Sequence, residues 1–301
     1  MSILYALGGT GPSGFGAGST AEQVSAGLDL AGRHILVTGC NSGLGLETCR
    51  VLALRGATVI GAARTVEKAE AAVRPMGGRG VACELSDPAS VRAAVASLGN
   101  GPPLDAIVCN AGIMALPERQ VMHGVELQFF TNHVGHFILV TGLLSRLVEG
   151  GRVVVLSSAA HKTAPKEGIR LDDLGAERAY SAWANYGQAK LANLLFAREL
   201  ARRLDGGRRA NAVHPGVIAT GLARSMNPVM QAAWSLAGPL LLKSIPQGAA
   251  TQTWASVSPG AAALNGEYLA DCNVAASSRL GADMGLAAKL WEATEAIVAR
   301  V

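Results

Sequence analysis

The chain has 301 residues, of which 50% are apolar and 16% are charged, and 37 of them are glycine. Such a chain can bury a large core, so a disordered protein is excluded. The net charge of +4 is small and the arginines are dispersed, which argues against a nucleic-acid partner.

The five cysteines show neither a CxxC pair nor the spacing of metal ligands, so we expect buried thiols in a reducing compartment and no metal site. No secretory signal is evident at the N-terminus. The apolar stretch at 226–242 is interrupted by Pro and Gly and is short for a bilayer span. We therefore expect a cytoplasmic protein without an integral membrane segment.

The first 20 residues are rich in Gly and Ser and predict a loose arm, with a helical turn that begins near Thr20. We place the arm at 1–32 and a single domain at 33–301. In that domain short β-branched runs alternate with amphipathic segments. The expected strands lie at 34–37, 57–62, 80–83, 105–110, 152–157 and 211–214. The expected helices lie at 45–54, 66–73, 90–98, 124–147 and 182–204.

Strands that are apolar on both faces and alternate with helices predict an α/β fold with a parallel sheet covered on both sides. Right-handed crossovers would make it a doubly wound parallel sheet, the Rossmann fold. Its ligand crevice is expected beyond the carboxyl ends of the strands.

A glycine-rich turn joins the first strand to the first helix, where Thr38-Gly39 is followed by Gly43 and Gly45. Glycine allows close approach to a pyrophosphate, and the helix N-terminus offers N–H groups to its oxygens. An ordinary strand–helix loop is the alternative, but this turn opens the first βαβ unit, where a dinucleotide would bind.

The second strand is followed by Ala62-Ala63-Arg64, without the acidic residue that binds a ribose 2′-hydroxyl. The planar guanidinium of Arg64 could instead pair with a 2′-phosphate. The sequence thus favours NADP(H), with NAD(H) possible; a solvent-facing role for Arg64 is the alternative.

Tyr186 and Lys190 are four residues apart and share one face of a helix. A phenol has an ordinary pKa of about 10, and a nearby ammonium lowers that pKa by favouring phenolate. Ser158 adds a hydroxyl upstream of this pair, although Ser157 competes with it. Asn132 could bond neighbouring backbone within its own helix.

These motifs, in this order, resemble the short-chain dehydrogenase/reductase family. The resemblance rests on Thr38-Gly39-x-x-x-Gly43-x-Gly45, Asn110-Ala111-Gly112, Asn132, Ser158, Tyr186-x-x-x-Lys190 and Pro215-Gly216-x-x-x-Thr220. The segments SSAAH, YGQAKLANLLFARELARRL and GEYLADC are similar to the retinol dehydrogenase-like and WW-domain oxidoreductase-like branch.

The resemblance implies a catalytic set of Asn132, Ser158, Tyr186 and Lys190. In this set Ser158 would position a carbonyl oxygen, and Asn132 would hold a water that links Lys190 to solvent. It also implies that the cofactor contacts Gly39, Asn41, Ser42, Gly43, Leu44, Gly45, Arg64, Glu84, Leu85, Asn110, Ala111, Gly112, Tyr186, Lys190, Pro215, Gly216, Val217 and Thr220. Glu84 stands where many relatives carry Asp. An inserted loop between Lys162 and Ala179 is expected to shape the mouth of the cleft.

After Thr220 an apolar segment broken by Pro and Gly predicts a small substrate lid at about 221–245. Its apolar side chains would line a pocket for a lipophilic molecule (Met226, Met230, Trp234 and Leu240), although a packing or oligomer contact is an alternative.

We therefore expect an NADP-dependent alcohol dehydrogenase or carbonyl reductase. It would transfer a hydride between nicotinamide and the carbonyl or alcohol carbon of a small lipophilic ketone, aldehyde or alcohol. A non-catalytic NADP-binding sensor or scaffold is the main alternative, and nucleotide-sugar epimerisation is disfavoured by the glycine spacing.

The helices expected at 124–147 and 182–204 are long and rich in small residues. Paired across a two-fold axis they would form a four-helix contact, as the resemblance also implies. We therefore expect a homodimer or homotetramer.

Overall fold

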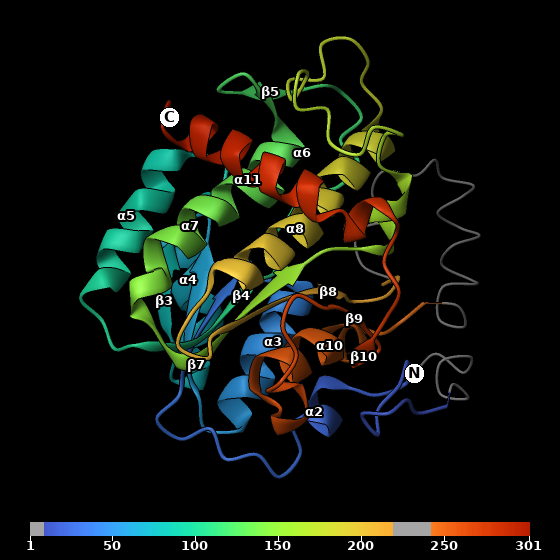
Figure 1. Ribbon diagram of the computed structural model, residues 1–301. Helices are drawn as coiled ribbons and strands as arrows, with labels where there is room; N and C mark the ends of the chain where they lie inside the picture. The colour runs from blue at the N-terminus through green and yellow to red at the C-terminus, as the bar shows by residue number, and fades with distance from the viewer. Residues whose placement is uncertain (1–8, 219–241) are drawn as a thin grey trace, which may run out of the picture.

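The structure is a computed structural model that describes residues 9–218 and 242–301. An eight-stranded sheet runs through the centre of this part of the chain (Figure 1). All neighbouring strands are parallel except the last pair, β9 and β10. The strand order is β10 (Asn273–Val274), β9 (Tyr268–Ala270), β8 (Arg209–His214), β7 (Leu147–Leu156), β4 (Leu104–Cys109), β1 (His34–Thr38), β2 (Thr58–Ala63) and β3 (Arg79–Ala82).

Helices cover both faces of the sheet, because its central strands are apolar on both sides. In β1, Leu36 packs into one cluster of buried side chains, whereas Ile35 and Val37 pack into the other. The first face carries α5 (Pro88–Gly99), α6 (Leu127–Phe129), α7 (Gly135–Leu143), α8 (Ala182–Arg203) and α11 (Met284–Val298). The second carries α2 (Ala21–Val24), α3 (Gly43–Leu54), α4 (Val66–Val73) and α10 (Ile245–Val257). The doubly wound α/β fold is therefore confirmed.

Short turns and one hairpin connect these elements. The 3₁₀ turns are η1 (Arg74–Met76), η3 (Leu144–Arg146), η4 (Ala159–Thr163), η6 (Pro259–Ala261) and η7 (Leu280–Ala282), and the hairpin pairs β5 (Val121–Met122) with β6 (Val125–Glu126).

The prediction of a helix at 124–147 is wrong at both ends, and the helix is not a continuous α-helix. Residues 124–126 belong to the hairpin, the helix starts at Leu127, and Leu147 already begins β7. A π-helical turn, η2 (Phe130–Val134), interrupts the helix before α7. Hydrophobic periodicity does not reveal this turn, because all five of its residues are buried.

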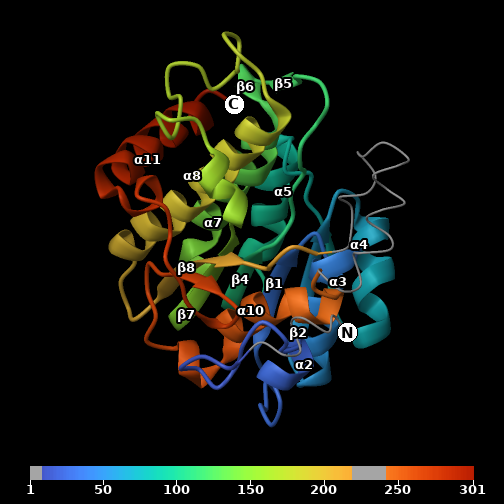
Figure 2. The same cartoon turned by 90° about the vertical axis from the view of Figure 1, so that its right-hand side faces the viewer.

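The described part of the N-terminal arm is packed onto the domain, so the expectation of a loose segment is wrong for residues 9–20, whereas the helical turn expected near Thr20 is present as α2. The side chain of Asn273 accepts from Ser13 N at 3.0 Å and donates to Phe15 O at 3.0 Å. The hydroxyl of Thr20 caps α2, which lies against α10 (Figure 2).

The C-terminal helix α11 lies across α8 in Figure 1 and covers the face expected to form a dimer contact. The ring of Trp291 stacks on Phe196 of α8 at 5.9 Å and meets Phe137 of α7 edge-on at 4.8 Å. Within α7, Gly135 to Val140 are buried inside the protomer. These faces of α7 and α8 are thus buried by the same chain, and the four-helix contact expected from them stays a prediction.

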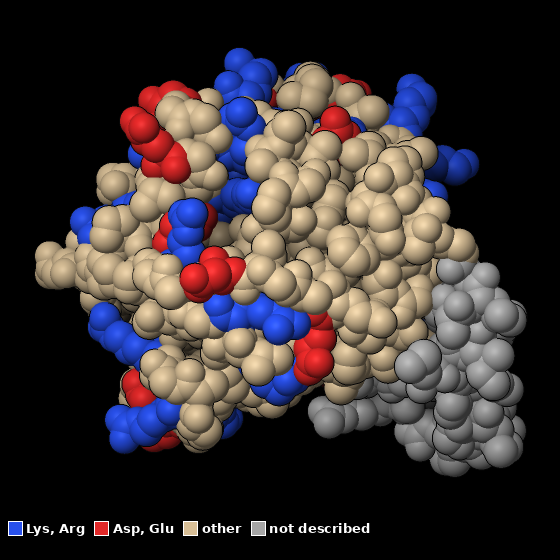
Figure 3. All heavy atoms as spheres, turned by 90° about the horizontal axis from the view of Figure 1, so that it is seen from below, with Lys and Arg blue, Asp and Glu red and all other residues tan. Residues whose placement is uncertain are grey.

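Charges of both signs are interspersed on the face shown in Figure 3. Among the described residues no helix is long and apolar enough to cross a bilayer. The described residues also contain no group of three or more His, Cys, Asp or Glu side chains that could hold a metal ion.

Candidate active site

The glycine-rich turn leaves the carboxyl end of β1 and enters α3. Gly39 adopts a φ of +70°, and a Cβ there would lie 3.0 Å from Asn110 Nδ2, so only glycine fits without strain. At the N-cap of α3, the Ser42 hydroxyl makes no capping hydrogen bond. The first-turn N–H groups of this 12-residue helix are thus uncapped by side chains and suit an anion such as a pyrophosphate.

A crevice opens around this turn at the carboxyl ends of β1 to β4. The residues expected at the cofactor that line it are Gly39, Asn41, Ser42, Gly43, Leu44, Arg64, Glu84, Leu85, Asn110, Ala111 and Gly112. Gly45 does not line it. A Cβ at Gly45 would collide with the Gly39 carbonyl, so this glycine lets α3 pack closely against the turn.

Arg64 and Glu84 both line the crevice, but they differ in whether their side chains are bonded to neighbouring residues. Arg64 is exposed and makes no hydrogen bond or ion pair with another described residue, so its guanidinium is available to a ligand. The Glu84 carboxylate instead accepts from Ser86 Oγ at 2.9 Å and Ser86 N at 3.1 Å. The structure therefore brings Glu84 to the crevice but commits one of its oxygens to the neighbouring loop.

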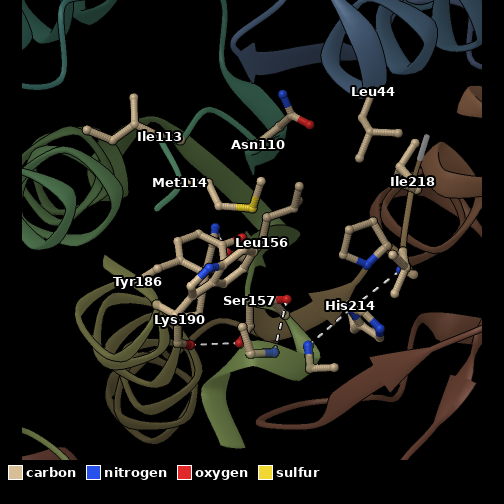
Figure 4. A pocket seen from close by; sticks show the side chains of 18 residues that line it. Leu44, Asn110, Ile113, Met114, Leu156, Ser157, Tyr186, Lys190, His214 and Ile218 are labelled. Atoms are coloured by element: carbon tan, nitrogen blue, oxygen red, sulfur yellow. Dashed lines mark hydrogen bonds between the residues drawn. The ribbon is translucent and has the colours of Figure 1, made fainter. Parts of the chain in front are cut away.

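Tyr186 and Lys190 lie on one face of α8, as their spacing predicts. Lys190 Nζ is 5.7 Å from the centroid of the Tyr186 ring and donates to Leu156 O at 3.0 Å. Both residues line a cavity of about 540 Å³ (Figure 4). Asn110 and Gly112 border this cavity and also the crevice at the turn, so the two spaces adjoin.

The two candidate serines differ in what their hydroxyls contact. The buried Ser157 donates to the carbonyl of Lys190 at 2.7 Å, which commits it to α8. Ser158 Oγ accepts from Ala160 N at 3.1 Å, and its interaction with Tyr186 opposes the rise in the pKa of that phenol. Ser158 is thus the serine whose hydroxyl acts on the phenol.

Burial shifts the pKa values of both groups of the Tyr–Lys pair toward their neutral forms. It raises the pKa of Tyr186 to about 12, opposed by the hydrogen bond with Ser158. It lowers the pKa of Lys190 to about 8. For the protein groups alone, desolvation sets the direction of the Tyr186 shift. The expectation that Lys190, aided by the charge of an oxidised nicotinamide, lowers this pKa stays a prediction.

Asn132 lies in the π-helical turn behind the cavity and holds the loop that follows β4. Its Oδ1 accepts from Ile113 N at 2.8 Å, and its Nδ2 donates to Ile113 O at 2.9 Å. A Cβ on Gly112 would lie 2.9 Å from Asn132 Oδ1 and 3.6 Å from Lys190 Nζ. The amide therefore bonds backbone outside its own helix, next to Lys190, and its water-holding role stays a prediction.

Pro215, Gly216 and Val217 follow β8 and line the cavity. His214 also lines it, and its Nδ1 accepts from Gly216 N at 3.4 Å.

Part of the predicted site lies outside the described residues. This applies to Thr220, to 221–241 of the predicted lid, and to the pocket residues Met226, Met230, Trp234 and Leu240.

Several apolar cavity residues were not predicted from the sequence: Met114, Leu156, Trp183 and Ile218. The Trp183 and Tyr186 rings meet edge to face, 6.2 Å apart and at 84°. Trp183 precedes Tyr186 by three helical positions, so helical spacing could have indicated it. Met114 carries no such signal, since a loop brings it to the cavity.

The inserted loop between Lys162 and Ala179 is bonded to the segment that leads into α6. Among the described residues that line the cavity, none belongs to this loop. Leu174 O instead accepts from Glu126 N at 2.8 Å, and Gly175 O accepts from Arg119 Nε at 2.7 Å. The expectation that the loop shapes the cleft mouth is wrong for the described cavity, because the loop pairs with the segment that leads into α6.

Known proteins resemble the chain over nearly its whole length. A family model described as short chain dehydrogenase matches residues 33–169. A short-chain dehydrogenase TIC 32 B, chloroplastic, from Brassica napus is 39% identical over 303 residues, covering 95% of this chain and 94% of that protein. Retinol dehydrogenase 12 from Mus musculus is 38% identical over 302 residues, covering 97% and 93%. The chain belongs to the short-chain dehydrogenase/reductase family. It is retinol dehydrogenase-like within that family.

Solved structures of the family agree with the fold. A crystal structure of a protein from Mycobacterium paratuberculosis has a TM-score of 0.74 and 36% identity, covering 91% of this chain and 96% of that one. A blue fluorescent protein from a metagenomic library, solved in complex with NADPH, has a TM-score of 0.63 and 26% identity, covering 80% and 97%. This family member is thus similar in fold to a protein that binds a nicotinamide cofactor.

Proposed function

We propose that this family member is an NADP-dependent alcohol dehydrogenase or carbonyl reductase. It would transfer a hydride between the nicotinamide ring and the carbonyl or alcohol carbon of a small lipophilic ketone, aldehyde or alcohol. One observation carries the proposal: Ser158, Tyr186 and Lys190 converge on a cavity that adjoins the crevice at the glycine-rich turn.

The residues at the crevice fit a nicotinamide dinucleotide. The uncapped N-terminus of α3 and the close approach allowed by Gly39 suit the pyrophosphate. The exposed guanidinium of Arg64, which is bonded to no other described residue, suits a 2′-phosphate, and this supports NADP(H) over NAD(H). When bound, the cofactor supplies or accepts the hydride.

In the reductive direction, Tyr186 donates its phenolic proton to the carbonyl oxygen, and it recovers a proton from the alcohol in the oxidative direction. Ser158 donates a hydrogen bond to the same oxygen and fixes its position next to the phenol. Lys190 holds positive charge 5.7 Å from the ring, which favours phenolate when the proton leaves.

The walls of the cavity support a lipophilic substrate. Most side chains that face it beside the catalytic group are apolar (Met114, Leu156, Trp183, Pro215, Val217 and Ile218). The name of the similar retinol dehydrogenase 12 states a lipophilic alcohol as that protein's substrate, which supports the same class here.

A non-catalytic NADP-binding sensor or scaffold is disfavoured. A sensor does not need a serine hydroxyl, a phenol and a buried ammonium on one cavity, and all three line the cavity here. Cytoplasmic location stays a prediction. Assembly into a dimer or tetramer also stays one.

The proposed function is tested with purified protein in two steps. Fluorescence titration with NADPH and NADH measures cofactor binding, and a panel of lipophilic aldehydes, ketones and alcohols is then followed by nicotinamide absorbance. Tyr186→Phe should abolish turnover and leave NADPH affinity nearly unchanged. Tyr180→Phe is the matched control, because the Tyr180 hydroxyl bonds Leu116 O and lies outside the cavity lining. NADPH binding without turnover across the panel would favour the sensor.

A further inference from the structure

His136 in α7 is fully buried, and both of its ring nitrogens are hydrogen-bonded. Nε2 lies 2.9 Å from Thr38 Oγ1, at the start of the glycine-rich turn. Nδ1 lies 2.9 Å from the carbonyl oxygen of Asn132, in the π-helical turn behind the cavity. The imidazole thus spans from the cofactor crevice to the back of the proposed catalytic centre.

The direction of each bond follows from counting protons on Thr38. Its Oγ1 accepts from Asn110 N at 2.9 Å and from Ala111 N at 3.0 Å, which occupies both acceptor positions of a hydroxyl. Its one proton must therefore be donated. His136 Nε2 at 2.9 Å is a better acceptor than Val108 O at 3.5 Å.

The same count fixes the tautomer of the imidazole. Because Nε2 accepts from Thr38, Nδ1 carries the proton and donates it to Asn132 O. Burial lowers the pKa of His136 to about 4, which keeps the ring neutral at physiological pH. A protonated ring would leave Nε2–H facing a hydroxyl that has no free lone pair.

The Asn132 end of these hydrogen bonds lies near the catalytic lysine. Asn132 holds Ile113 through two hydrogen bonds, and a Cβ on Gly112 would meet both Asn132 Oδ1 at 2.9 Å and Lys190 Nζ at 3.6 Å, so the amide and the ammonium lie near the same glycine. Thus the loop after β4 is held from two sides, by Thr38 at Asn110 and Ala111 and by Asn132 at Ile113. His136 ties the two holding groups to each other.

We propose that His136 is a positioning residue that couples the cofactor-binding turn to the catalytic centre through Thr38 and Asn132. The inference rests on the proposed function, since it assigns His136 to the same site. Binding of a nicotinamide cofactor against the loop 110–113 then affects the position of Asn132 beside Lys190. Loss of the bridge weakens cofactor binding and turnover together.

The tautomer is tested without any turnover. Nitrogen-15 NMR of the histidine rings should show His136 as the neutral Nδ1–H form in the wild-type protein. Thr38→Val removes the donor to Nε2 and should shift the Nε2 resonance, while the His133 resonances stay in place. A wild-type ring protonated on Nε2 would overturn the proposal.

The coupling is tested by a double-mutant cycle of His136→Phe and Thr38→Val, read out as NADPH dissociation constant and kcat. His136→Phe keeps a ring of similar size and removes both bonds. It should weaken NADPH binding severalfold and lower kcat roughly tenfold or more, as expected when reacting groups lose their position. Because the two variants break the same chain of hydrogen bonds, the double variant should change the dissociation constant and kcat by less than the product of the two single fold-changes. His136→Gln, which retains a donor and an acceptor, should recover part of both losses.

His133→Phe is the matched control. His133 is equally buried in the adjoining π-helical turn, but its Nε2 bonds Thr294 of α11 and not the cofactor turn. This variant should lower stability and leave the NADPH dissociation constant and kcat near wild type. Equal effects of the two phenylalanine variants, or multiplying effects in the cycle, would overturn the coupling. If His136→Phe does not fold, the same comparison is made with His136→Gln and Thr38→Val.

A wrong proposed function can be told apart from a wrong role for His136. In that case the wild-type protein turns over no substrate in the panel. The NADPH dissociation constants in the cycle and the NMR tautomer still decide whether His136 couples to the turn.

Discussion

Lys190 and Asn193 donate to the same acceptor, the carbonyl oxygen of Leu156, at 3.0 and 2.9 Å. The ammonium is therefore dispensable for satisfying this carbonyl, because the Asn193 amide remains bonded to it. Lys190 is 5% exposed, and its burial lowers its pKa from 10.5 to about 8. The fold thus bears the cost of a buried charge that structure alone does not require.

Lys190→Met should abolish turnover yet stabilise the protein. A pKa lowered from 10.5 to about 8 corresponds to a cost of up to about 3 kcal/mol at pH 7, which the apolar side chain relieves. Between pH 8 and 10.5 the unfolded wild type binds more protons than the folded one, so wild-type stability rises with pH and the advantage of the variant shrinks. Urea unfolding at pH 7 and pH 10 measures this, with Lys162→Met at an exposed site as the control. A destabilised Lys190→Met at pH 7 would contradict it.

The catalytic side chains were predictable from the sequence because helical geometry and strand order place them. The four-residue spacing of Tyr186 and Lys190 fixes their common face on α8. The ends of parallel strands bring Gly39, Asn110 and Ser158 to one edge of the sheet. These relationships depend only on backbone periodicity, which the sequence carries.

Relationships that depend on packing between distant segments were not predictable. The bridge from His136 to Thr38 spans 98 positions and arises because α7 crosses over the end of β1. The stacking of Trp291 on Phe196 depends on where the C-terminal helix docks. The desolvation that raises the pKa of Tyr186 was not predictable either, because the burial of a side chain cannot be deduced from a Tyr–Lys spacing.

The rate of carbonyl reduction should fall as the pH rises through about 8. Lys190, with its pKa lowered to about 8 by burial, loses its charge there, whereas Tyr186 keeps its proton until about pH 12. The alkaline limb of kcat/KM therefore reports Lys190 and not the phenol. A pH series from 6 to 10 checks this. In Lys190→Arg the limb should disappear, since arginine stays charged; an unchanged limb would assign it to another group.

Ser158→Ala and Ser157→Ala should separate catalysis from stability. Ser158→Ala removes the hydroxyl that lines the cavity with Tyr186 and should lower kcat by about 100-fold or more with little change in unfolding free energy. Ser157→Ala leaves the Lys190 carbonyl without its 2.7 Å donor and should cost about 1–3 kcal/mol of stability. Steady-state kinetics and urea unfolding of both variants check this. If Ser157→Ala proves the more damaging to kcat at full folding, Ser158 is not the catalytic serine.

Arg64→Ala should weaken NADPH binding without weakening NADH binding. The guanidinium is exposed at the crevice and bonded to no other described residue, so it is lost without disturbing the fold. Loss of a charge-assisted pair with a 2′-phosphate in partial solvent should cost about 1.5–3 kcal/mol, or roughly 10- to 150-fold in dissociation constant. Lys68→Ala is the control, because this exposed cation lies one turn into α4 and outside the crevice lining. Fluorescence titration with both cofactors measures the effect. If Arg64→Ala weakens NADPH binding and NADH binding equally, the guanidinium does not bind the 2′-phosphate, and the preference for NADP(H) must come from another residue.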